Sequence, residues 1–234
     1  MSEMPFKQVT VVGLGLLGGS IGRAVQVQMP GVRVVGYDAD AGVRQKAREL
    51  GLAHVVAETA AQAAQGSDLV VLCVPVGAMG AAAAELADGL SAEAVISDVG
   101  SSKGSVARAL AEALPGHHVI PAHPVAGTER SGPEAGFATL FANRWCIVTP
   151  PEDADPVQVA RLVAFWEALG ARVETMDADH HDLVLAVTSH LPHLIAYTIV
   201  GTASDLEEVT QSEVIKYSAG GFRDFTRIAA SDPT

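Results

Sequence analysis

The chain is poor in cysteine. Only two cysteines occur among 234 residues, and they do not form a C-x-x-C pair. Cys73 lies in the apolar run of residues 69–76 and Cys146 in residues 145–148, so we expect both to be small buried side chains in strands. This usage argues against a secreted domain held together by disulfide bonds and favours a reducing cytoplasm.

Basic residues are also scarce. The chain has 15 Lys and Arg against 27 Asp and Glu, which gives a formal net charge of -12. Such a surface is a poor partner for nucleic acid or anionic lipid, so neither is expected. The N-terminal stretch MSEMPFKQ lacks the basic and apolar regions of a signal peptide, and no apolar run is expected to reach membrane-spanning length. An acidic protein that handles an anionic substrate must therefore place its few cations locally.

Glycine, by contrast, follows a defined spacing near the N-terminus. The β-forming residues 9–12 lead into Gly13, Gly15 and Gly18, spaced G-x-G-x-x-G, and then into a helical segment at residues 21–27. In such a turn the first glycine allows the sharp bend, the second lets the backbone approach a pyrophosphate, and the third allows close helix packing. The phosphates then meet unpaired N–H groups at the positive end of the helix dipole. The motif predicts a dinucleotide site.

A second apolar strand, at residues 32–37, ends at Asp38, which lies at the usual spacing of about twenty residues after the last glycine. Its carboxylate can accept both ribose hydroxyls and would repel a 2′-phosphate, which favours NAD over NADP. Arg44 leaves NADP open, and Asp38 could instead cap the helix at residues 41–50. The residues predicted to contact the cofactor are Gly13, Gly15, Leu16, Leu17, Gly18, Asp38, Val74 and Pro75.

Apolar strands and helices alternate as far as residue 176, without internal repeats or low-complexity tracts. This order is typical of a sheet covered on both faces, so we predict an α/β, Rossmann-type doubly wound, mainly parallel sheet. Beyond it, helical periodicity dominates and is interrupted only by Pro192. We predict a dinucleotide-binding domain at residues 1–177 and an all-helical substrate and dimerisation domain at residues 178–234. The latter is expected to be incomplete, because the chain stops at SDPT without a closing helix. Later strands are expected at residues 54–56, 69–74, 94–98, 118–121, 145–149 and 172–176, the last closing the sheet.

His123 is the leading catalytic candidate. It follows an apolar strand in the motif AHPVAG, at the sheet edge where the glycine turn also lies. Pro124 restricts His123 to extended geometry. A neutral imidazole is the natural base for an alcohol that loses hydride, since its pKa lies near working pH. The alternative is an ordinary hydrogen-bonded loop histidine.

Two polar residues follow the preceding strand in the motif VGSSKG. Ser101 could hydrogen-bond the same substrate hydroxyl, or it could be a turn or N-cap serine. Lys103 could attract an anion or be a surface residue. Ser101 joins His123 as a catalytic candidate.

Near the C-terminus, Arg223 and Arg227 lie four residues apart and share one face if the segment is helical. Their planar guanidinium groups are suited to hold both oxygens of a carboxylate. A structural ion pair centred on Asp224 is the alternative. In the motif TERSG, Thr128, Glu129 and Arg130 offer further polar groups or form a solvated loop.

Four histidines lie close together in the helical region. His190 and His193 are three apart, but Pro192 lies between them and no third ligand is near, while His180 and His181 are adjacent and point apart on a helix. We therefore predict no metal site.

Five motifs together resemble the prephenate dehydrogenase family, including its arogenate and cyclohexadienyl members. They are GLGLLGGS, DVGSSKGS, HPVAGTERSG, SHLPH and GFRDFTRIAASDP, in this order over essentially the whole chain. The resemblance implies NAD-dependent oxidative decarboxylation of prephenate to 4-hydroxyphenylpyruvate, or of arogenate to tyrosine, in tyrosine biosynthesis. It also implies a homodimer built by further C-terminal helices, and tyrosine as an inhibitor.

The same resemblance suggests a role for individual residues. His123 is similar to the catalytic histidine that binds the ring hydroxyl, and Ser101 to its hydrogen-bonding partner. Arg227 resembles the arginine that binds the substrate carboxylate, with His193 in the pocket. Glu129 and Asp224 resemble members of a polar gate. The residues expected to bind the substrate are Arg227, His193, Glu129, Thr128 and Asp224.

Two other functions remain open from the sequence. One is another small-acid dehydrogenase or imine reductase with the same cofactor fold. The other is a non-catalytic NAD-sensing regulatory module, which would bind the cofactor without turnover. Prephenate and arogenate, which differ by a keto or an amino group, both fit the motifs.

Overall fold

The computed structural model describes residues 4–205 and 220–230, which form two compact units. The first unit contains residues 4–127 and 131–182, and the second contains residues 128–130, 183–205 and 220–230. Each unit is described by itself. The predicted boundary near residue 177 lies just before the helix in which the division falls, and the expected ending at residues 231–234 lies outside the described residues.

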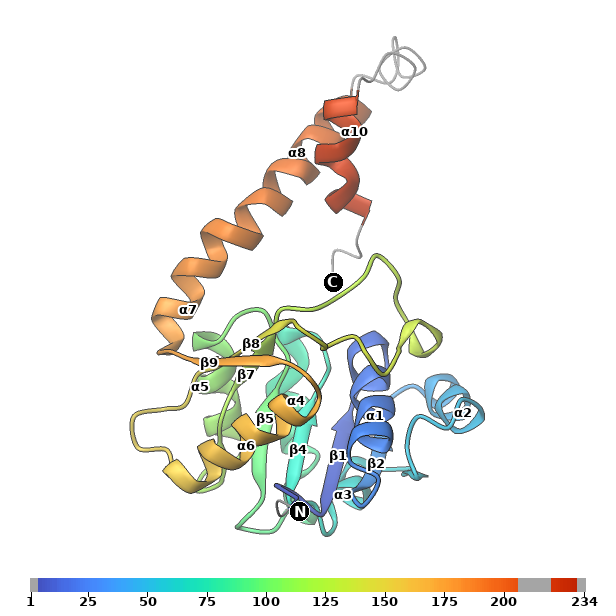
Figure 1. Cartoon of the computed structure of the whole chain (residues 1–234), viewed down its shortest axis with the longest axis vertical. Coiled ribbons are helices and arrows are strands. Elements are labelled where there is room, and N and C mark those ends of the chain that lie inside the picture. Colours follow the sequence, from blue (N-terminus) through green and yellow to red (C-terminus); the bar gives the residue numbers. More distant parts are fainter. Residues whose placement is uncertain (1–3, 206–219, 231–234) are drawn as a thin grey trace. The chain divides into compact units, whose positions relative to one another are not determined.

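The first unit is built on a six-stranded parallel sheet, whose strand order is β3-β2-β1-β4-β5-β6 (Figure 1). This confirms the predicted α/β, doubly wound class. The strands are β1 (Gln8–Val12), β2 (Arg33–Tyr37), β3 (Val55–Val56), β4 (Leu69–Leu72), β5 (Val95–Asp98) and β6 (His118–Val119). The helices are α1 (Leu16–Gln28), α2 (Ala41–Glu49), α3 (Ala60–Ala64), α4 (Met79–Ala84), α5 (Gly104–Ala113) and α6 (Pro156–Ala168).

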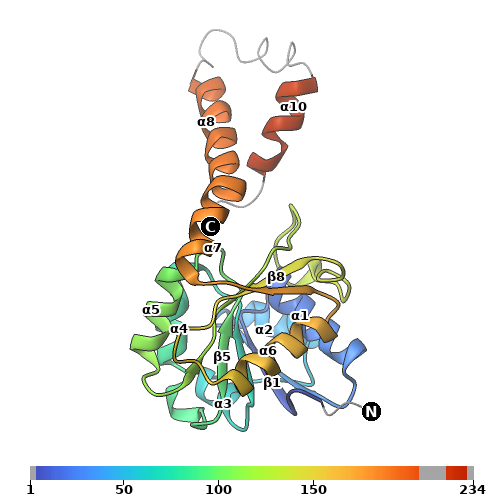
Figure 2. The same cartoon turned by 60° about the vertical axis from the view of Figure 1, so that its left-hand side comes forward.

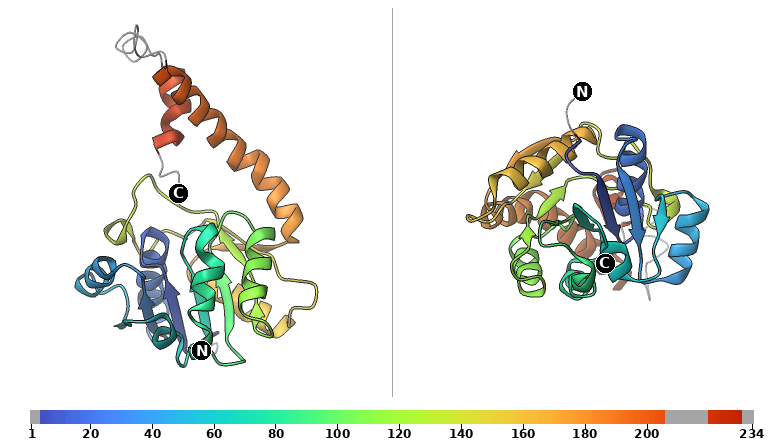
Figure 3. Two further views of the ribbon diagram at one scale, coloured as in Figure 1. Left: turned by 180° about the vertical axis from the view of Figure 1, so that it is seen from behind. Right: turned by 90° about the horizontal axis from the view of Figure 1, so that it is seen from below.

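Both faces of this sheet are buried, as its continuous apolar strands require. Val9 and Val11 of β1 belong to a core cluster that includes residues of α1 and α6, whereas Val12 belongs to a second cluster with residues of α4 and α5. Figure 3 shows the helices on the two sides of the sheet. The carboxyl ends of β1 and β4 are neighbours at the point where the strand order reverses, which is where such sheets bind ligands.

A second sheet of three strands lies in the same unit. It consists of β7 (Ala122–Pro124), β8 (Trp145–Val148) and β9 (Arg172–Thr175), with β7 antiparallel to β8 and β8 parallel to β9. Two expectations are therefore wrong: residues 172–176 do not close the main sheet, and the strand at residues 118–121 ends at Val119. Pro121 has no N–H to donate to a ladder, and the chain turns there into the second sheet.

The second unit is helical (Figure 2). Its long helix comprises α7 (Ala178–Leu185), which begins in the first unit, a π-helical turn (Ala186–His190) and α8 (Leu191–Asp205). Then α10 (Gly220–Thr226) and a 3₁₀ turn (Arg227–Ala230) pack on α8. Pro192 does not interrupt the helix. In a regular α-helix a proline clashes with the carbonyl group four residues earlier. The π-helical turn directly before α8 changes the hydrogen-bond pattern at this point, and the helix continues through Pro192.

This helix is also notable for its hydropathy. The stretch Ala178–Ala203 is long and apolar enough, by length and composition only, to cross a bilayer. The expectation that no segment reaches that length is therefore wrong by this measure. In the most apolar 18-residue stretch of this helix, 11% is buried. Most of the apolar surface of the helix is therefore not covered by other described residues.

Candidate functional site

The glycine turn between β1 and α1 can be formed only by residues without a side chain at two of its positions. Gly13 has φ of 90°, and a Cβ added there would lie 2.5 Å from the carbonyl oxygen of Cys73 at the end of β4. A Cβ on Gly18 would lie 1.8 Å from the carbonyl oxygen of Gly13. The turn is therefore packed against both the neighbouring strand and its own helix.

Gly15 has the opposite surroundings. It is the N-cap residue of α1, supplies no side-chain cap, and would have no protein atom within 4 Å of an added Cβ. Leu16 and Leu17, both half-buried, follow it in the first turn, whose N–H groups have no carbonyl partner within the helix. This open space in front of a helix N-terminus fits a pyrophosphate.

Asp38 follows β2 and lies beside this turn. Its Oδ2 accepts a hydrogen bond from the Leu14 N–H (2.8 Å), and its Oδ1 accepts one from the Asp40 N–H (2.9 Å). The alternative role as the cap of α2 is excluded, because Asp40 accepts from the Val43 N–H there. Asp38 is thus fixed at the strand end that a dinucleotide-binding sheet uses for the ribose.

Arg44 is engaged elsewhere. Its Nη1 donates to the carbonyl oxygens of Asp38 (2.9 Å) and Ala39 (3.1 Å), and its Nε lies 3.3 Å from Glu58 Oε2. Because the guanidinium already binds these oxygens, it is not poised for a 2′-phosphate. On the other side of the turn, Val74 and Pro75 follow β4; Val74 is half-buried and Pro75 is exposed.

Asp98 and Lys103 form a buried ion pair behind the sheet edge. The Lys103 ammonium contacts Asp98 Oδ2, and both side chains are fully buried. Burial raises the pKa of Asp98 and lowers that of Lys103, and the attraction between them opposes both shifts. Lys103 was expected to attract an anion or to lie on the surface; both expectations are wrong, because the carboxylate that ends β5 holds it inside.

This pair also holds the start of β7. Lys103 Nζ donates to the Ala122 carbonyl oxygen (2.8 Å), and the Ala122 N–H donates to Asp98 Oδ1 (3.2 Å). The N–H and the C=O of Ala122, the residue before His123, are thereby hydrogen-bonded to the end of β5 and the start of α5.

His123 itself is 8% exposed and contacts another histidine. Its Nδ1 lies 2.9 Å from Nε2 of His181, and the rings meet edge to face. His181 is fully buried, and its Nδ1 lies 2.9 Å from Asp182 Oδ1. The sequence had identified His123 but neither His181 nor Asp182. The adjacent histidines do point apart, with His180 exposed and His181 buried, but their spacing does not say which one faces inward.

Ser101 is exposed in the bend before α5, and the N-cap position of that helix is occupied by Lys103. The N-cap alternative for Ser101 is therefore excluded, whereas the alternative of a turn serine agrees with its place in a bend. Its proposed contact with a substrate hydroxyl stays a prediction.

Several of the residues predicted to bind substrate belong to the second unit. Arg227 Nη1 lies 3.0 Å from Glu129 Oε1, and both side chains are more than half exposed. Thr128 Oγ1 accepts a hydrogen bond from the Arg130 N–H at 3.2 Å. His193 donates from Nδ1 to the Ser189 carbonyl oxygen (2.9 Å), and Asp224 is exposed. The structure therefore pairs Arg227 with Glu129.

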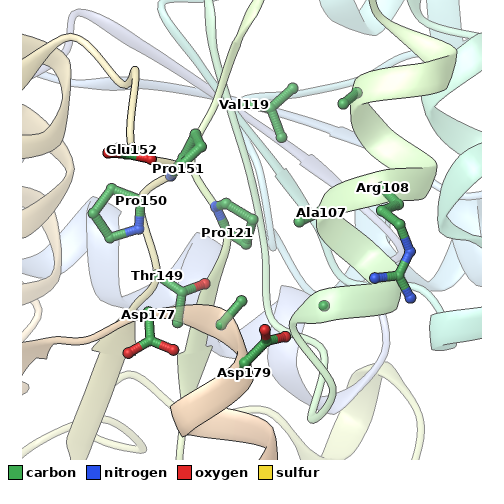
Figure 4. A pocket seen from close by; sticks show the side chains of 13 residues that line it. Ala107, Arg108, Val119, Pro121, Thr149, Pro150, Pro151, Glu152, Asp177 and Asp179 are labelled. Atoms are coloured by element: carbon green, nitrogen blue, oxygen red, sulfur yellow. The ribbon is translucent and has the colours of Figure 1, made fainter.

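A pocket of about 350 Å³ lies beside α5 in the first unit (Figure 4). Its walls are largely apolar, and Thr149 in it is buried, with no partner for its hydroxyl among the described residues. None of the predicted site residues lines it. Within residues 4–205 and 220–230, no three His, Cys, Asp or Glu side chains are grouped as metal ligands would be. The pocket is lined by Gly104, Ala107, Arg108, Ala111, Val119, Pro121, Thr149, Pro150, Pro151, Glu152, Asp177, Ala178 and Asp179.

Comparisons with known proteins agree on one family. The chain matches the model of the prephenate dehydrogenase nucleotide-binding domain at residues 21–175 and that of the prephenate dehydrogenase dimerization domain at residues 177–234. The first match begins after the glycine turn, so that turn is supported by the structure rather than by the match.

Individual relatives give the same result. The chain is 46% identical to a cyclohexadienyl dehydrogenase of Zymomonas mobilis over 97% of its own length and 78% of the relative. It is 34% identical to a prephenate dehydrogenase of Bacillus subtilis, of which it spans 61%. The crystal structure of prephenate dehydrogenase from A. aeolicus, in complex with hydroxyphenyl propionate and NAD+, superposes with a TM-score of 0.89 at 35% identity. That match covers 97% of this chain and 79% of the other.

Proposed function

Because the chain belongs to the prephenate dehydrogenase family, we propose that it catalyses the NAD-dependent oxidative decarboxylation of prephenate to 4-hydroxyphenylpyruvate, of arogenate to tyrosine, or of both. The observation that carries this proposal is that one unit contains both a dinucleotide-type glycine turn and His123, held by hydrogen bonds at the start of β7. The products place the enzyme in tyrosine biosynthesis.

We propose that the first unit binds NAD through the turn after β1. The N–H groups of the first turn of α1 bind the pyrophosphate in front of Gly15, and Asp38 accepts the ribose hydroxyls. Val74 and Pro75 line the adenosine side at the end of β4. The engagement of Arg44 with backbone oxygens and Glu58 supports NAD rather than NADP. When bound, NAD accepts the hydride that leaves the ring carbon bearing the hydroxyl.

In this proposal His123 is the base. It takes the hydroxyl proton as the carbon is oxidised, and Ser101 donates a hydrogen bond to the same oxygen. When the ring carboxylate leaves as carbon dioxide, its electron pair restores the aromatic ring, and the ring oxygen takes the proton back from His123. The proton is thus borrowed and returned, and no proton is released overall. Aromatisation supplies the driving force, so the protein has to orient the substrate and hold the proton.

We further propose that the second unit binds the anionic groups of the substrate. Arg227 is the carboxylate ligand, because its planar fork can hold two oxygens. Its present partner Glu129 would share or exchange the guanidinium with the substrate. Thr128, Asp224 and His193 complete the polar surroundings. Tyrosine carries a phenol ring, as the product 4-hydroxyphenylpyruvate does, and a carboxylate. We therefore propose that tyrosine competes with the substrate for this site.

The partner of the second unit is, in our proposal, a second copy of the chain. The helix from α7 to α8 carries exposed Leu183, Val187, Leu191 and Leu194, in a region that matches a dimerization domain. We place the enzyme in the cytoplasm, where its free Cys73 and Cys146 would stay reduced.

The direct test is turnover. The purified protein is mixed with prephenate or arogenate and with NAD or NADP, and reduced cofactor is followed by absorbance at equal enzyme concentration. We expect NADH formation with at least one substrate and a clear preference for NAD. Binding of NAD without turnover of either substrate would contradict the proposed activity.

Replacement of His123 tests the role of the base. We expect His123→Asn to lower kcat by roughly 10²- to 10⁴-fold, the usual scale for a lost general base, with the Kd for NAD unchanged. The measurements are steady-state kinetics and a titration of NAD against protein fluorescence. An unchanged kcat would remove His123 from the mechanism.

A further inference from the structure

His181 and Asp182 form a continuous hydrogen-bonded connection from the N-terminus of α5 to His123. The chain of contacts runs from the backbone N–H groups of Lys103 and Gly104 through the Asp182 carboxylate and the His181 ring to Nδ1 of His123. We propose that His181 and Asp182 are positioning residues that fix His123 in the tautomer whose Nε2 is unprotonated. This inference deepens the proposed function and rests on it for its catalytic meaning.

The Asp182 carboxylate sets the direction of the hydrogen bonds. Its Oδ1 accepts from the Lys103 N–H at 2.7 Å and its Oδ2 from the Gly104 N–H at 2.9 Å, at the positive end of the α5 dipole. Partial burial raises the pKa of Asp182, but these two N–H groups and the His181 ring outweigh it, so the pKa lies below its ordinary value. The carboxylate is therefore ionised at neutral pH and can only accept hydrogen bonds.

The two rings follow from this acceptor. His181 Nδ1 faces Asp182 at 2.9 Å and must carry a proton, so Nε2 of the neutral His181 ring has a lone pair. The 2.9 Å contact with His123 then requires that Nδ1 of His123 be the donor. Neutral His123 consequently has its lone pair on Nε2, which is the nitrogen that takes the proton in the proposed mechanism.

The same arrangement stabilises the charged form of His123. Once Nε2 has taken a proton, the positive charge is shared with His181 and offset by Asp182, without movement of either ring. Ionisable groups near the start of β7 include Asp98 and Lys103, which pair with each other beside Ala122, and the thiol of Cys146 on β8. Burial raises the pKa of that thiol, which keeps it neutral. Asp182 is a carboxylate in direct contact with the histidine pair, through His181 Nδ1.

A purely structural role predicts something different. If the two histidines only filled the core, their tautomers would not depend on Asp182, and any loss of activity would follow the loss of stability. The tautomer and the pH dependence of kcat therefore distinguish the two roles.

The first experiment reads the tautomer directly and needs no substrate. Two-bond ¹⁵N–¹H correlation spectra of the histidine rings are recorded for the full chain above the pKa of His123, and signals are assigned with His123→Asn. We expect a protonated Nδ1 and an unprotonated Nε2 for His123. In Asp182→Ala we expect the other tautomer to become populated, whereas Asp179→Ala, which removes an exposed carboxylate one turn earlier on α7, leaves the spectrum unchanged. A protonated Nε2 in the wild-type protein would overturn the proposal.

The second experiment measures activity. We expect Asp182→Ala to lower kcat by about 10- to 100-fold, by analogy with the loss that follows removal of a group orienting a metal-binding imidazole. KM values should change by no more than about twofold. Because the carboxylate favours the imidazolium, the acidic limb of the kcat profile should shift to lower pH by about half a unit to one unit. Two outcomes would contradict a positioning role. One is a loss of activity in Asp182→Ala without a shift of the acidic limb of the kcat profile, and the other is an equal loss of activity in Asp179→Ala.

Variants of His181 provide a further check. Gln at this position offers an amide oxygen to Nδ1–H of His123, whereas Leu offers none, so His181→Gln should keep more of the wild-type kcat than His181→Leu. Equal rates in the two variants would overturn the role of His181. If the wild-type protein fails to oxidise prephenate and arogenate, the proposed function is wrong. The tautomer measured by NMR still tests, independently of activity, whether His181 and Asp182 position His123.

Discussion

Gly15 and Gly18 lie three positions apart in one turn and have opposite surroundings. A Cβ on Gly18 would collide with the Gly13 carbonyl oxygen at 1.8 Å, whereas one on Gly15 would meet no protein atom within 4 Å. We expect Gly18→Ala to destabilise the fold by about 1–3 kcal/mol through overpacking. Gly15→Ala should fold normally and weaken NAD binding by about tenfold, since the added methyl group takes the space in front of the helix.

Urea unfolding and an NAD titration on both variants measure this difference. The two substitutions are chemically identical, so each serves as the control of the other. Normal NAD affinity in a stable Gly15→Ala variant would show that the pyrophosphate does not approach this position.

Single residues also show what the sequence could predict about the site. His123 was recognisable because a His-Pro pair ends a strand, and Asp38 because an acid closes the second one. The burial of Lys103 was not predicted, because lysine is rarely buried. Asp98 was the available signal, since a carboxylate at the end of a fully apolar strand requires a partner. The role of His181 could not be predicted. Two adjacent histidines on a helix must point in different directions, but the sequence does not show which of the two is buried.

At the scale of elements, the Asp98–Lys103 pair joins β5, α5 and β7. Lys103→Met keeps an unbranched apolar side chain that is slightly shorter than lysine, but leaves the Asp98 carboxylate buried without its counter-ion. We expect a loss of about 3–5 kcal/mol in the free energy of unfolding, measured by urea denaturation. Lys46→Met is the matched control: Lys46 pairs with Glu134 on the surface, and we expect no measurable change in the midpoint. Equal midpoints for the two variants would show that the buried pair is not a stabilising link.

The division into two sheets could not be derived from the strand pattern. The eight expected strands correspond closely to observed ones, but apolar alternation does not identify the partner of a strand. Pro121 was the available signal, since it cannot donate in a ladder and separates β6 from β7. The parallel sheet was predictable because alternation of strands and helices limits the topology strongly.

At the scale of the whole molecule, the exposed apolar helix predicts self-association. Leu194 on α8 and Val157 on α6 are both 63% exposed, which makes them a matched pair for substitution by Glu. We expect Leu194→Glu to shift the molar mass, measured by light scattering after size exclusion, from dimer toward monomer. Val157→Glu should leave it unchanged. A wild-type protein that is monomeric at micromolar concentration, or that partitions into lipid vesicles, would contradict a second copy as the partner.

The π-helical turn at Ala186–His190 has a geometric consequence for that face. A step of four residues along an α-helix advances about 40° beyond a full circle, so Leu183 and Val187 are angularly offset. Across the wider turn, with roughly 4.4 residues per revolution, the same step falls about 30° short of a circle and brings Leu191 back toward the azimuth of Leu183. The extra residue thus straightens what would otherwise be a spiralling seam.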